Sequence, residues 1–435
     1  MTGTATNKPV TTGLLRFSTA GSVDDGKSTL IGRLLYDSKS LFEDQLTQVE
    51  RASKRLRRDT VDLSLLTDGL IAEREQGITI DVAYRYFATP KRKFIIADTP
   101  GHEQYTRNMV TGASTSDLAI VLVDARKGLS IQSRRHALIA RLLGIRHVVL
   151  AVNKMDLVGY DEAVFARIEA DFLAFINNPA LPGAAPEVHT IPLSALLGDN
   201  VVDASANLAW YQGPTLLDLL ETVDVSHTLA SQPFRFPVQL INRPQQAESL
   251  ELHDFRGYQG RIESGQIRIG DAVSIAPGGR TSRIKDIVVF ELGQLVSRTS
   301  AHAPQSVTLR LEDDIDISRG DLIADADHPP TAAAGFSAVV CWMDAEPLDL
   351  TRKYLLKLGT RTTLAKFAGL DARLDVQDGT RLDAGTLALN DIGIARIRTQ
   401  QPVAFDAYRD NRATGGFIVI DEVTNRTVAA GMIHG

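Results

Sequence analysis

The first half of the chain alternates short apolar runs with stretches in which apolar residues recur at helical spacing. Three of the runs are continuous, as expected for strands buried on both faces of a parallel sheet: 94–97, 118–123 and 148–152. A short apolar run at 14–18 leads into a glycine-rich turn. Another run, 80–87, alternates, with Tyr84 and Tyr86 on the same face. The segments 30–35 and 136–143 have helical spacing. This order predicts βαβ units, and therefore an α/β domain with a mostly parallel sheet.

The pattern changes at about Phe234, where short strand-like runs begin to follow one another with turn residues between them. These runs are 234–241, 260–263, 266–269, 272–275, 283–290 and 306–311. Their spacing is typical of an antiparallel barrel or sandwich. A proline-containing break at 327–331 precedes a further strand-rich stretch. We predict three domains, an α/β domain at 1–230 and two small β domains at 231–328 and 329–435. One large β domain after residue 234 is the alternative.

Composition excludes several classes of protein. The chain has 435 residues, of which 44% are hydrophobic and 23% charged, a typical globular composition. Its net charge of -6 argues against a large nucleic-acid footprint. With one cysteine, Cys341, the chain has no intrachain disulfide and no four-cysteine zinc site. The sequence lacks a signal-peptide pattern and any apolar run near the ~18 residues of a membrane span, so we expect a cytoplasmic location without membrane association.

A phosphate-binding loop is the strongest local signal. The motif G-x-x-x-x-G-K-[ST] lies between a strand-like and a helix-like segment and comprises Gly21, Ser22, Val23, Asp24, Asp25, Gly26, Lys27 and Ser28, with Thr29 directly after it. Its backbone N–H groups can surround phosphate oxygens, and the helix adds its positive end. Lys27 would reach the β- and γ-phosphates, and the Ser28 hydroxyl would bind Mg²⁺. The alternative is a glycine-rich turn with an exposed lysine.

A second signal follows the apolar run 94–97, where Asp98, Thr99, Pro100 and Gly101 stand in sequence. Asp98 would lie at the carboxyl end of a strand, where open α/β sheets bind their ligands. A carboxylate there can hold Mg²⁺ through water, and the Gly101 N–H can contact the γ-phosphate.

Two further loops indicate which base is bound. The run 148–152 leads into Asn153, Lys154, Met155 and Asp156. An aspartate can accept hydrogen bonds from N1–H and the exocyclic amine of guanine, and adenine offers neither in that arrangement. The residues Ser194, Ala195 and Leu196 fit the remaining base-contacting loop. Each motif alone could be a plain loop, but four in this order predict a GTPase.

These residues resemble the translational GTPase superfamily, whose members have a GTP-binding domain followed by two β-barrels. Residues 76–80 resemble its first switch segment, and 257–273 resemble its first barrel. The resemblance implies that Thr79 closes on Mg²⁺ and the γ-phosphate, that His102 orients the attacking water, and that Val23 and Ile78 form an apolar gate beside His102. A surface histidine at a turn is the alternative for His102.

Within that superfamily, three segments are most similar to the GTP-hydrolysing large subunits of bacterial sulfate adenylyltransferase: 21–39, 68–87 and 98–108. Elongation factors usually carry histidine at the position of Asp25. The resemblance implies a separate small subunit that makes adenosine 5′-phosphosulfate and pyrophosphate from ATP and sulfate, driven forward by GTP hydrolysis on this chain. A second phosphate-loop motif is absent after residue 28, so we expect the form without a fused kinase.

Two other functions are consistent with the same fold and motifs. An elongation factor that delivers aminoacyl-tRNA would share the fold and the GTP site, and a free-standing regulatory GTPase is a third hypothesis. The basic run 54–58 is typical of a solvated helix face, or else belongs to a switch insertion at 37–78. Cys341 and Trp342 are expected in a core.

Overall fold

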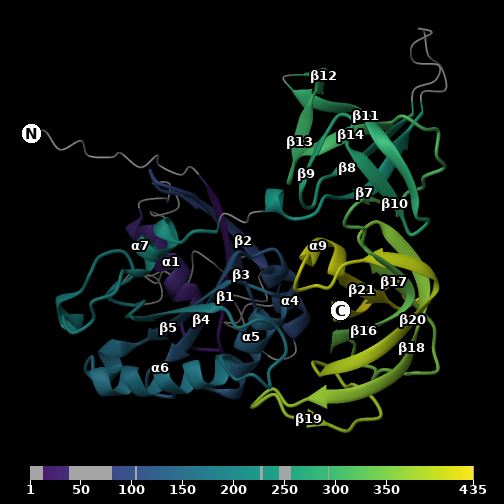
Figure 1. The fold of residues 1–435 in the computed structure, drawn as a ribbon. Helices are drawn as coiled ribbons and strands as arrows, with labels where there is room; N and C mark the ends of the chain where they lie inside the picture. Colours follow the sequence, from purple (N-terminus) through teal and green to yellow (C-terminus); the bar gives the residue numbers. More distant parts are fainter. Residues whose placement is uncertain are drawn as a thin grey trace, which may run out of the picture. The chain divides into compact units, whose positions relative to one another are not determined.

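The computed structural model describes residues 13–38, 81–102, 105–225, 229–243, 256–291 and 293–434. It divides into two compact units (Figure 1). Unit 1 comprises Met1–Val225 with Asp375–Thr380, and unit 2 comprises Ser226–Leu374 with Arg381–Gly435. No helix in these described ranges is both long and apolar enough to cross a membrane.

Unit 1 contains a six-stranded sheet in the order β2-β3-β1-β4-β5-β6. The strands are β1 (Leu14–Ala20), β2 (Ala83–Ala88), β3 (Lys93–Asp98), β4 (Leu118–Asp124), β5 (His147–Asn153) and β6 (Glu187–Pro192). Strand β2 runs antiparallel to β3, and the other neighbours are parallel. Every residue of β4 and β5 is buried, which explains why their sequences are continuous rather than alternating. The predicted α/β class is therefore confirmed.

Helices cover both faces of this sheet, with α1 and α7 on one side and α5 and α6 on the other (Figure 1). The helices are α1 (Lys27–Asp37), α4 (Thr106–Ser114), α5 (Ile131–Leu142), α6 (Glu162–Ile176) and α7 (Leu216–Thr222), with short 3₁₀ turns η3 (Met155–Val158) and η4 (Ala206–Leu208). Polar side chains cap three of them, since Ser130, Asp161 and Thr215 accept hydrogen bonds from first-turn amides of α5, α6 and α7. These caps fix where the helices begin.

Unit 2 begins with the 3₁₀ turn η5 (Leu229–Ser231) and a first barrel. Its strands are β7 (Arg235–Asn242), β8 (Gly257–Arg261), β9 (Gln266–Arg268), β10 (Ala272–Ala276), β11 (Arg280–Glu291), β12 (Gln294–Arg298), β13 (Ser300–His302), β14 (Ser306–Leu311) and β15 (Leu322–Asp325). The sheet order is β10-β15-β7-β8-β14-β11-β12, and β10 also pairs with β11. That extra pairing closes the sheet into a barrel, as the resemblance implied.

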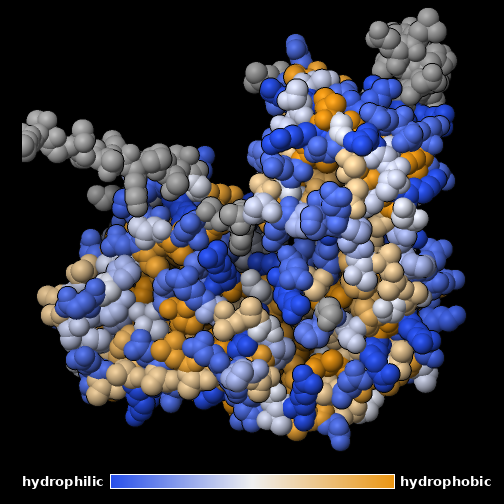
Figure 2. Space-filling view, viewed as in Figure 1, coloured by the Kyte–Doolittle hydropathy of each residue, from blue (hydrophilic) through white to orange (hydrophobic). Residues whose placement is uncertain are grey.

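The second barrel has the same plan. Its elements are β16 (Thr331–Trp342), β17 (Tyr354–Leu358), β18 (Arg361–Leu374), β19 (Arg381–Leu382), β20 (Ile392–Phe405), α9 (Arg412–Gly415), β21 (Gly416–Ile420) and β22 (Thr427–His434). The order is β17-β21-β22-β16-β20-β18-β19, and β17–β18 pairing closes it. Cys341 and Trp342 are buried in this part of the chain, as expected. Hydrophilic residues are prominent on the outer surface of unit 2 in Figure 2.

The two barrels are joined by polar contacts inside unit 2. The buried Arg235 guanidinium makes a bidentate ion pair with Asp406, with Nε and Nη2 each 2.8 Å from a carboxylate oxygen. Asn411 Nδ2 donates to Ser264 Oγ at 2.9 Å. A bidentate, largely buried pair is more specific in its geometry than a surface ion pair. The domain limits at 230 and 328 stay predictions.

Candidate functional site

The predicted phosphate loop connects β1 to α1, and two glycines allow other groups to approach it closely. Gly26 has a φ of 94°, and a Cβ there would lie 2.5 Å from Asn153 Nδ2. Gly101 comes from the loop after β3, and a Cβ there would overlap Lys27 Nζ and lie 2.6 Å from the backbone carbonyl oxygen of Gly21. Backbone can therefore approach backbone at this point, which is what a cradle of N–H groups requires.

Lys27 is the buried cation of the loop, with 7% of its surface exposed. Its Nζ donates to the carbonyl oxygens of Gly21, at 2.9 Å, and Ser22, at 3.0 Å. Burial lowers the pKa of Lys27, although the nearby carboxylates Asp98, Asp25 and Asp24 act in the opposite direction. Lys27 also begins α1, so unpaired amides of the first helical turn lie beside it. An anion would be attracted by both.

Asp25 shapes the loop from within. Its Oδ2 accepts a hydrogen bond of 2.7 Å from the Ser22 amide, and the residue is 4% exposed. Burial raises the pKa of this carboxyl, opposed by that hydrogen bond and by Lys27. Asp25 thus holds the backbone of its own loop in place.

Asp98 lies where the sequence predicts, at the carboxyl end of β3. It is 2% exposed, and Thr19 Oγ1, from the neighbouring β1, donates to its Oδ1 at 3.1 Å. Thr99 in turn donates from Oγ1 to the Thr19 carbonyl at 2.6 Å. These contacts fix a carboxylate beside the phosphate loop, where it could bind a cation through water.

Asn153 connects three of the predicted loops. Its Nδ2 donates to the Asp25 carbonyl at 2.7 Å, in the phosphate loop. Its Oδ1 accepts from the amides of Lys154 and Ala195, at 2.8 and 2.9 Å. The structure therefore brings residues 21–28, 153–156 and 194–196 together through one buried amide group.

One carboxylate oxygen of Asp156 is buried without a hydrogen-bond donor among the described residues. Its Oδ1 has no hydrogen-bond partner among the described residues, although the atom is inaccessible to solvent. Lys154, which precedes it by two residues, has a φ of 66° and begins the 3₁₀ turn η3. An unpaired buried acceptor costs about 1–3 kcal/mol. Asp156 as a whole is partly exposed, so its carboxylate could also accept from the N1–H and amine of a guanine.

The site is also supported by four residues that were not predicted from the sequence, Asp124, Arg126, Ser130 and Arg33. Asp124 binds Lys154 Nζ at 3.0 Å and Arg126 Nη2 at 2.7 Å. Burial opposes ionisation of Asp124, but these hydrogen bonds hold its pKa well below the usual range. Ser130 Oγ lies 2.8 Å from Ser22 Oγ, and Arg33 Nε donates to the Ala195 carbonyl at 3.2 Å. Asp124 ends β4 as Asp98 ends β3, and that parallel could have revealed it.

Other predicted residues have simpler placements. Ser28 and Thr29 lie in the first turn of α1, Pro100 is buried and Leu196 is 55% exposed. The His102 carbonyl accepts from the Tyr105 amide at 3.0 Å, and the two rings are 6.0 Å apart. Thr79, Ile78, the basic run and most of the 37–78 insertion lie outside the described residues, so their roles stay predictions.

A buried histidine near this site predicts acid sensitivity. His136, in α5, is 1% exposed, and burial lowers its pKa to about 3, with Lys27 and Arg135 adding to the effect. The unfolded chain takes up this proton near pH 6.5, so folding stability should fall between those values as the pH drops, by about 1.4 kcal/mol per pH unit. In His136→Leu this loss should disappear. Urea unfolding at pH 7, 6 and 5 measures it, with the exposed His328→Leu as control. Equal pH slopes in wild type and His136→Leu would contradict it.

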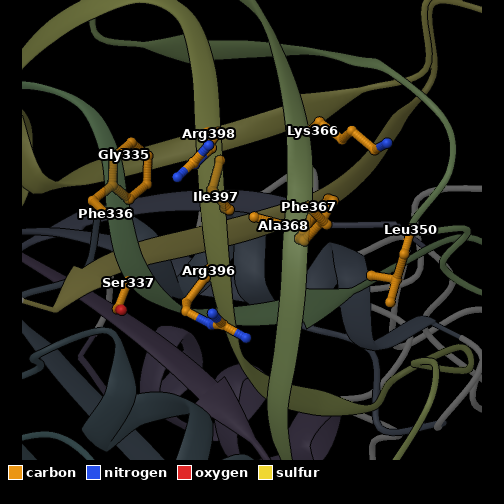
Figure 3. Close-up of a pocket in the computed structure, with 10 residues that line it drawn as sticks. All are labelled: Gly335, Phe336, Ser337, Leu350, Lys366, Phe367, Ala368, Arg396, Ile397 and Arg398. Atoms are coloured by element: carbon orange, nitrogen blue, oxygen red, sulfur yellow. The ribbon is translucent and has the colours of Figure 1, made fainter.

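A second concave surface lies on the second barrel, with a volume of about 720 Å³ (Figure 3). Lys366, Arg396 and Arg398 contribute basic groups to its lining. Arg396 Nε pairs with Asp371 at 2.9 Å, so one of these cations is already neutralised. Apart from Leu350, the lining comes from strands β16, β18 and β20 and lacks a helix N-terminus, so the cradle in unit 1 suits a triphosphate better.

Comparisons with known proteins agree with this geometry. The family described as elongation factor Tu GTP binding domain matches residues 13–228, and the GTP-eEF1A C-terminal domain-like family matches 335–434. Sulfate adenylyltransferase subunit 1 of Alteromonas mediterranea is 51% identical over 97% of this chain and 86% of its own length. The protein of the same name from Chromobacterium violaceum is 54% identical, with the same coverage of 97% and 86%. The bifunctional enzyme NodQ of Rhizobium sp. is 53% identical over 97% of this chain, which spans 63% of that longer protein.

Proposed function

The chain belongs to the family of sulfate adenylyltransferase subunit 1, and on that premise we propose that it is a GTPase subunit that drives sulfate activation. GTP hydrolysis here is coupled to the synthesis of adenosine 5′-phosphosulfate and pyrophosphate from ATP and sulfate. A separate small subunit binds ATP and adenylylates the sulfate. The complex works in the cytoplasm, without nucleic acid or membrane.

The observation that carries the nucleotide part of this proposal is the buried network around Asn153. It holds residues 21–28, 153–156 and 194–196 in one arrangement, which supports a nucleotide site in which Asp156 reads the base. A site of this kind favours the base that satisfies it and rejects one that does not. The sulfate part rests on the relatives, which are similar over 97% of the chain.

The chemistry on GTP is mainly positioning and charge stabilisation. Amides of the phosphate loop and Lys27 would hold the β- and γ-phosphates. Ser28, Thr79 and, through water, Asp98 would hold Mg²⁺, which neutralises charge developing on the phosphate oxygens. His102 would orient the attacking water, with Val23 and Ile78 as the apolar gate beside it.

The coupling is tested with the chain and its small subunit copurified. GTP turnover of the chain alone should be slow, and it should rise when the partner, ATP and sulfate are all present, because each ligand biases a shared conformational equilibrium. Omission of sulfate is the matched control. GTP turnover that does not respond to ATP and sulfate but rises with aminoacyl-tRNA would favour the elongation-factor hypothesis instead. The relatives that are similar over 97% of this chain do not support that hypothesis.

Replacement of the proposed water-orienting residue separates catalysis from binding. In His102→Ala, kcat for GTP should fall by about 10²–10⁴-fold with little change in nucleotide affinity, since the side chain would act only in the transition state. Single-turnover hydrolysis and equilibrium binding of labelled GTP measure the two quantities. His328→Ala, at an exposed histidine of unit 2, is the control. An unchanged kcat with raised KM would assign His102 to binding.

A further inference from the structure

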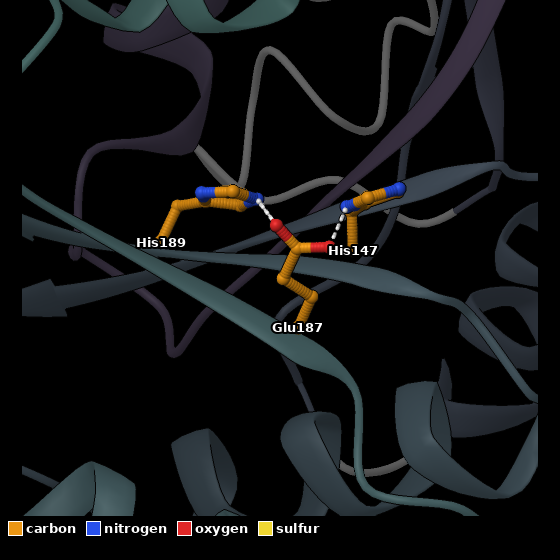
Figure 4. Close-up of side chains that lie close together, drawn as sticks. All are labelled: His147, Glu187 and His189. Atoms are coloured by element: carbon orange, nitrogen blue, oxygen red, sulfur yellow. Dashed lines mark ion pairs between the residues drawn. The ribbon is translucent and has the colours of Figure 1, made fainter. Parts of the chain in front are cut away.

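Two histidines and a glutamate meet at the edge of the sheet opposite the nucleotide site. His147 is the first residue of β5, whose last residue is Asn153. Glu187 begins β6 and is the register partner of His147, and His189 follows two residues later along the same strand. Side chains two apart on a strand point to the same face. The pairing of β5 with β6 therefore brings all three side chains together (Figure 4).

The glutamate lies between the two imidazoles, with one carboxylate oxygen facing each ring. His147 Nδ1 is 3.5 Å from Glu187 Oε2, and His189 Nε2 is 3.6 Å from Glu187 Oε1 (Figure 4). The three atoms that could bind a metal lie within 4.8 Å of one another. Both ring nitrogens are buried and lack a hydrogen-bond partner among the described residues. The two ring nitrogens thus face different oxygens of one carboxylate without a hydrogen bond to either.

The other side of the His147 ring determines what its Nδ1 can do. Nε2 lies 3.1 Å from the backbone carbonyl of Asp224, directly after α7. A carbonyl can only accept, so Nε2 carries the proton and the neutral ring directs a lone pair from Nδ1 at the carboxylate. Two acceptors then face each other.

This arrangement is typical of metal-binding histidines, which usually donate their second ring N–H to a carbonyl or carboxylate. The distances also suit a small cation. Two ligands of a tetrahedral zinc ion, each at about 2.0–2.1 Å, are separated by about 3.4 Å. The observed 3.5 and 3.6 Å, which are measured to different oxygens of Glu187, are close to that value, and one ligand atom from each residue lies within 4.8 Å of the others.

We propose that His147, Glu187 and His189 form a binding site for a divalent transition cation of the zinc class. Two imidazoles and one carboxylate are a ligand set that Zn²⁺ accepts, with water in the fourth position. The ion can enter from solvent, because the side chains of Glu187 and His189 are 57% and 24% exposed. It would connect β5 to β6 and, through His147, to the backbone after α7. Its role is stabilisation of unit 1 and does not depend on the proposed GTP chemistry.

Zinc binding to the full-length chain tests the site. The protein, stripped of metal by a chelator that is then removed, is titrated with Zn²⁺ against a chromophoric competitor in excess Mg²⁺, and thermal unfolding is followed in parallel. Wild type should bind one more equivalent than Glu187→Gln or His189→Asn, or bind it at least about tenfold more tightly. Zinc should raise the unfolding temperature of wild type and not of these variants. Co²⁺ should give visible d–d absorption in wild type alone.

His328→Asn is the matched control, because His328 pairs with Asp325 at 3.3 Å and no described residue adds a third ligand to them. It should bind zinc as wild type does. Two results would overturn the proposal: no zinc binding by wild type, or the same stoichiometry and affinity in wild type and Glu187→Gln. In either case the cluster is a carboxylate shared by two imidazoles and no more.

Discussion

Lys27→Ala should lose GTP turnover by at least about a hundredfold. Lys27 is the buried cation of the phosphate loop, and its Nζ makes two hydrogen bonds to loop carbonyls. A triphosphate in this cradle would lose its principal protein cation, and the loop would also lose those contacts. Removal of even one group that stabilises a transition state costs about 10²–10³ in kcat in a water-excluded site. The effect should appear in both binding and hydrolysis.

The measurement is steady-state phosphate release together with binding of a fluorescent GTP analogue. Lys93→Ala is the control, because Lys93 is exposed and begins β3 at the end of the strand opposite Asp98. Circular dichroism and thermal unfolding establish that both variants are folded. Near-normal GTP turnover by a folded Lys27→Ala protein would contradict the proposal that this loop binds the phosphates of GTP.

Asp156→Asn should reverse the base preference. The substitution turns a buried acceptor into an amide that can donate, so guanine N1–H would face a donor and xanthine would offer the complementary oxygen. Sites that satisfy a base by hydrogen bonds discriminate strongly against an unmatched one, and we expect GTP affinity to fall by at least about a hundredfold while XTP affinity rises. The triphosphate contacts should be unaffected.

Competition binding of GTP and XTP gives the ratio directly. Asp161→Asn is the matched control: Asp161 caps α6 by accepting from the Ala163 amide, and asparagine caps a helix equally well. The control should keep the wild-type ratio. If Asp156→Asn also keeps the wild-type ratio of GTP to XTP affinity, other residues determine the base preference.

The sequence predicted the sheet and its loops because local pattern and chemistry coincide there. Strands β4 and β5 are continuous apolar runs, and the buried strands of a parallel sheet are the structures that such runs favour. The phosphate loop follows β1 and Asn153 ends β5, so the predicted ends of these strands also predicted where the two elements lie. The alternating sequence of β2 was also recognised, but alternation alone does not show which of the two faces is buried. Phe87 packs on Phe94, while Tyr84 and Tyr86 are 43% and 70% exposed.

Contacts between distant segments could not be predicted from spacing. Ser22 meets Ser130, which is 108 residues away, and Arg33 meets Ala195, 162 residues away. Neither pair belongs to a motif, since only the packing of α1, α5 and the last loop brings them together. The same holds for His147 and His189, which come together through strand register and read in the sequence as unrelated residues.

Conversion of labelled sulfate to adenosine 5′-phosphosulfate measures whether GTP hydrolysis on this chain drives sulfate activation. Four mixtures contain ATP and sulfate, with and without the small subunit and with and without GTP. We expect no product from this chain alone, a low level from the pair without GTP, and a large increase from the pair with GTP. A non-hydrolysable GTP analogue should leave the pair near the low level. Product from the lone chain, or product from the pair that is independent of GTP, would contradict the proposed coupling.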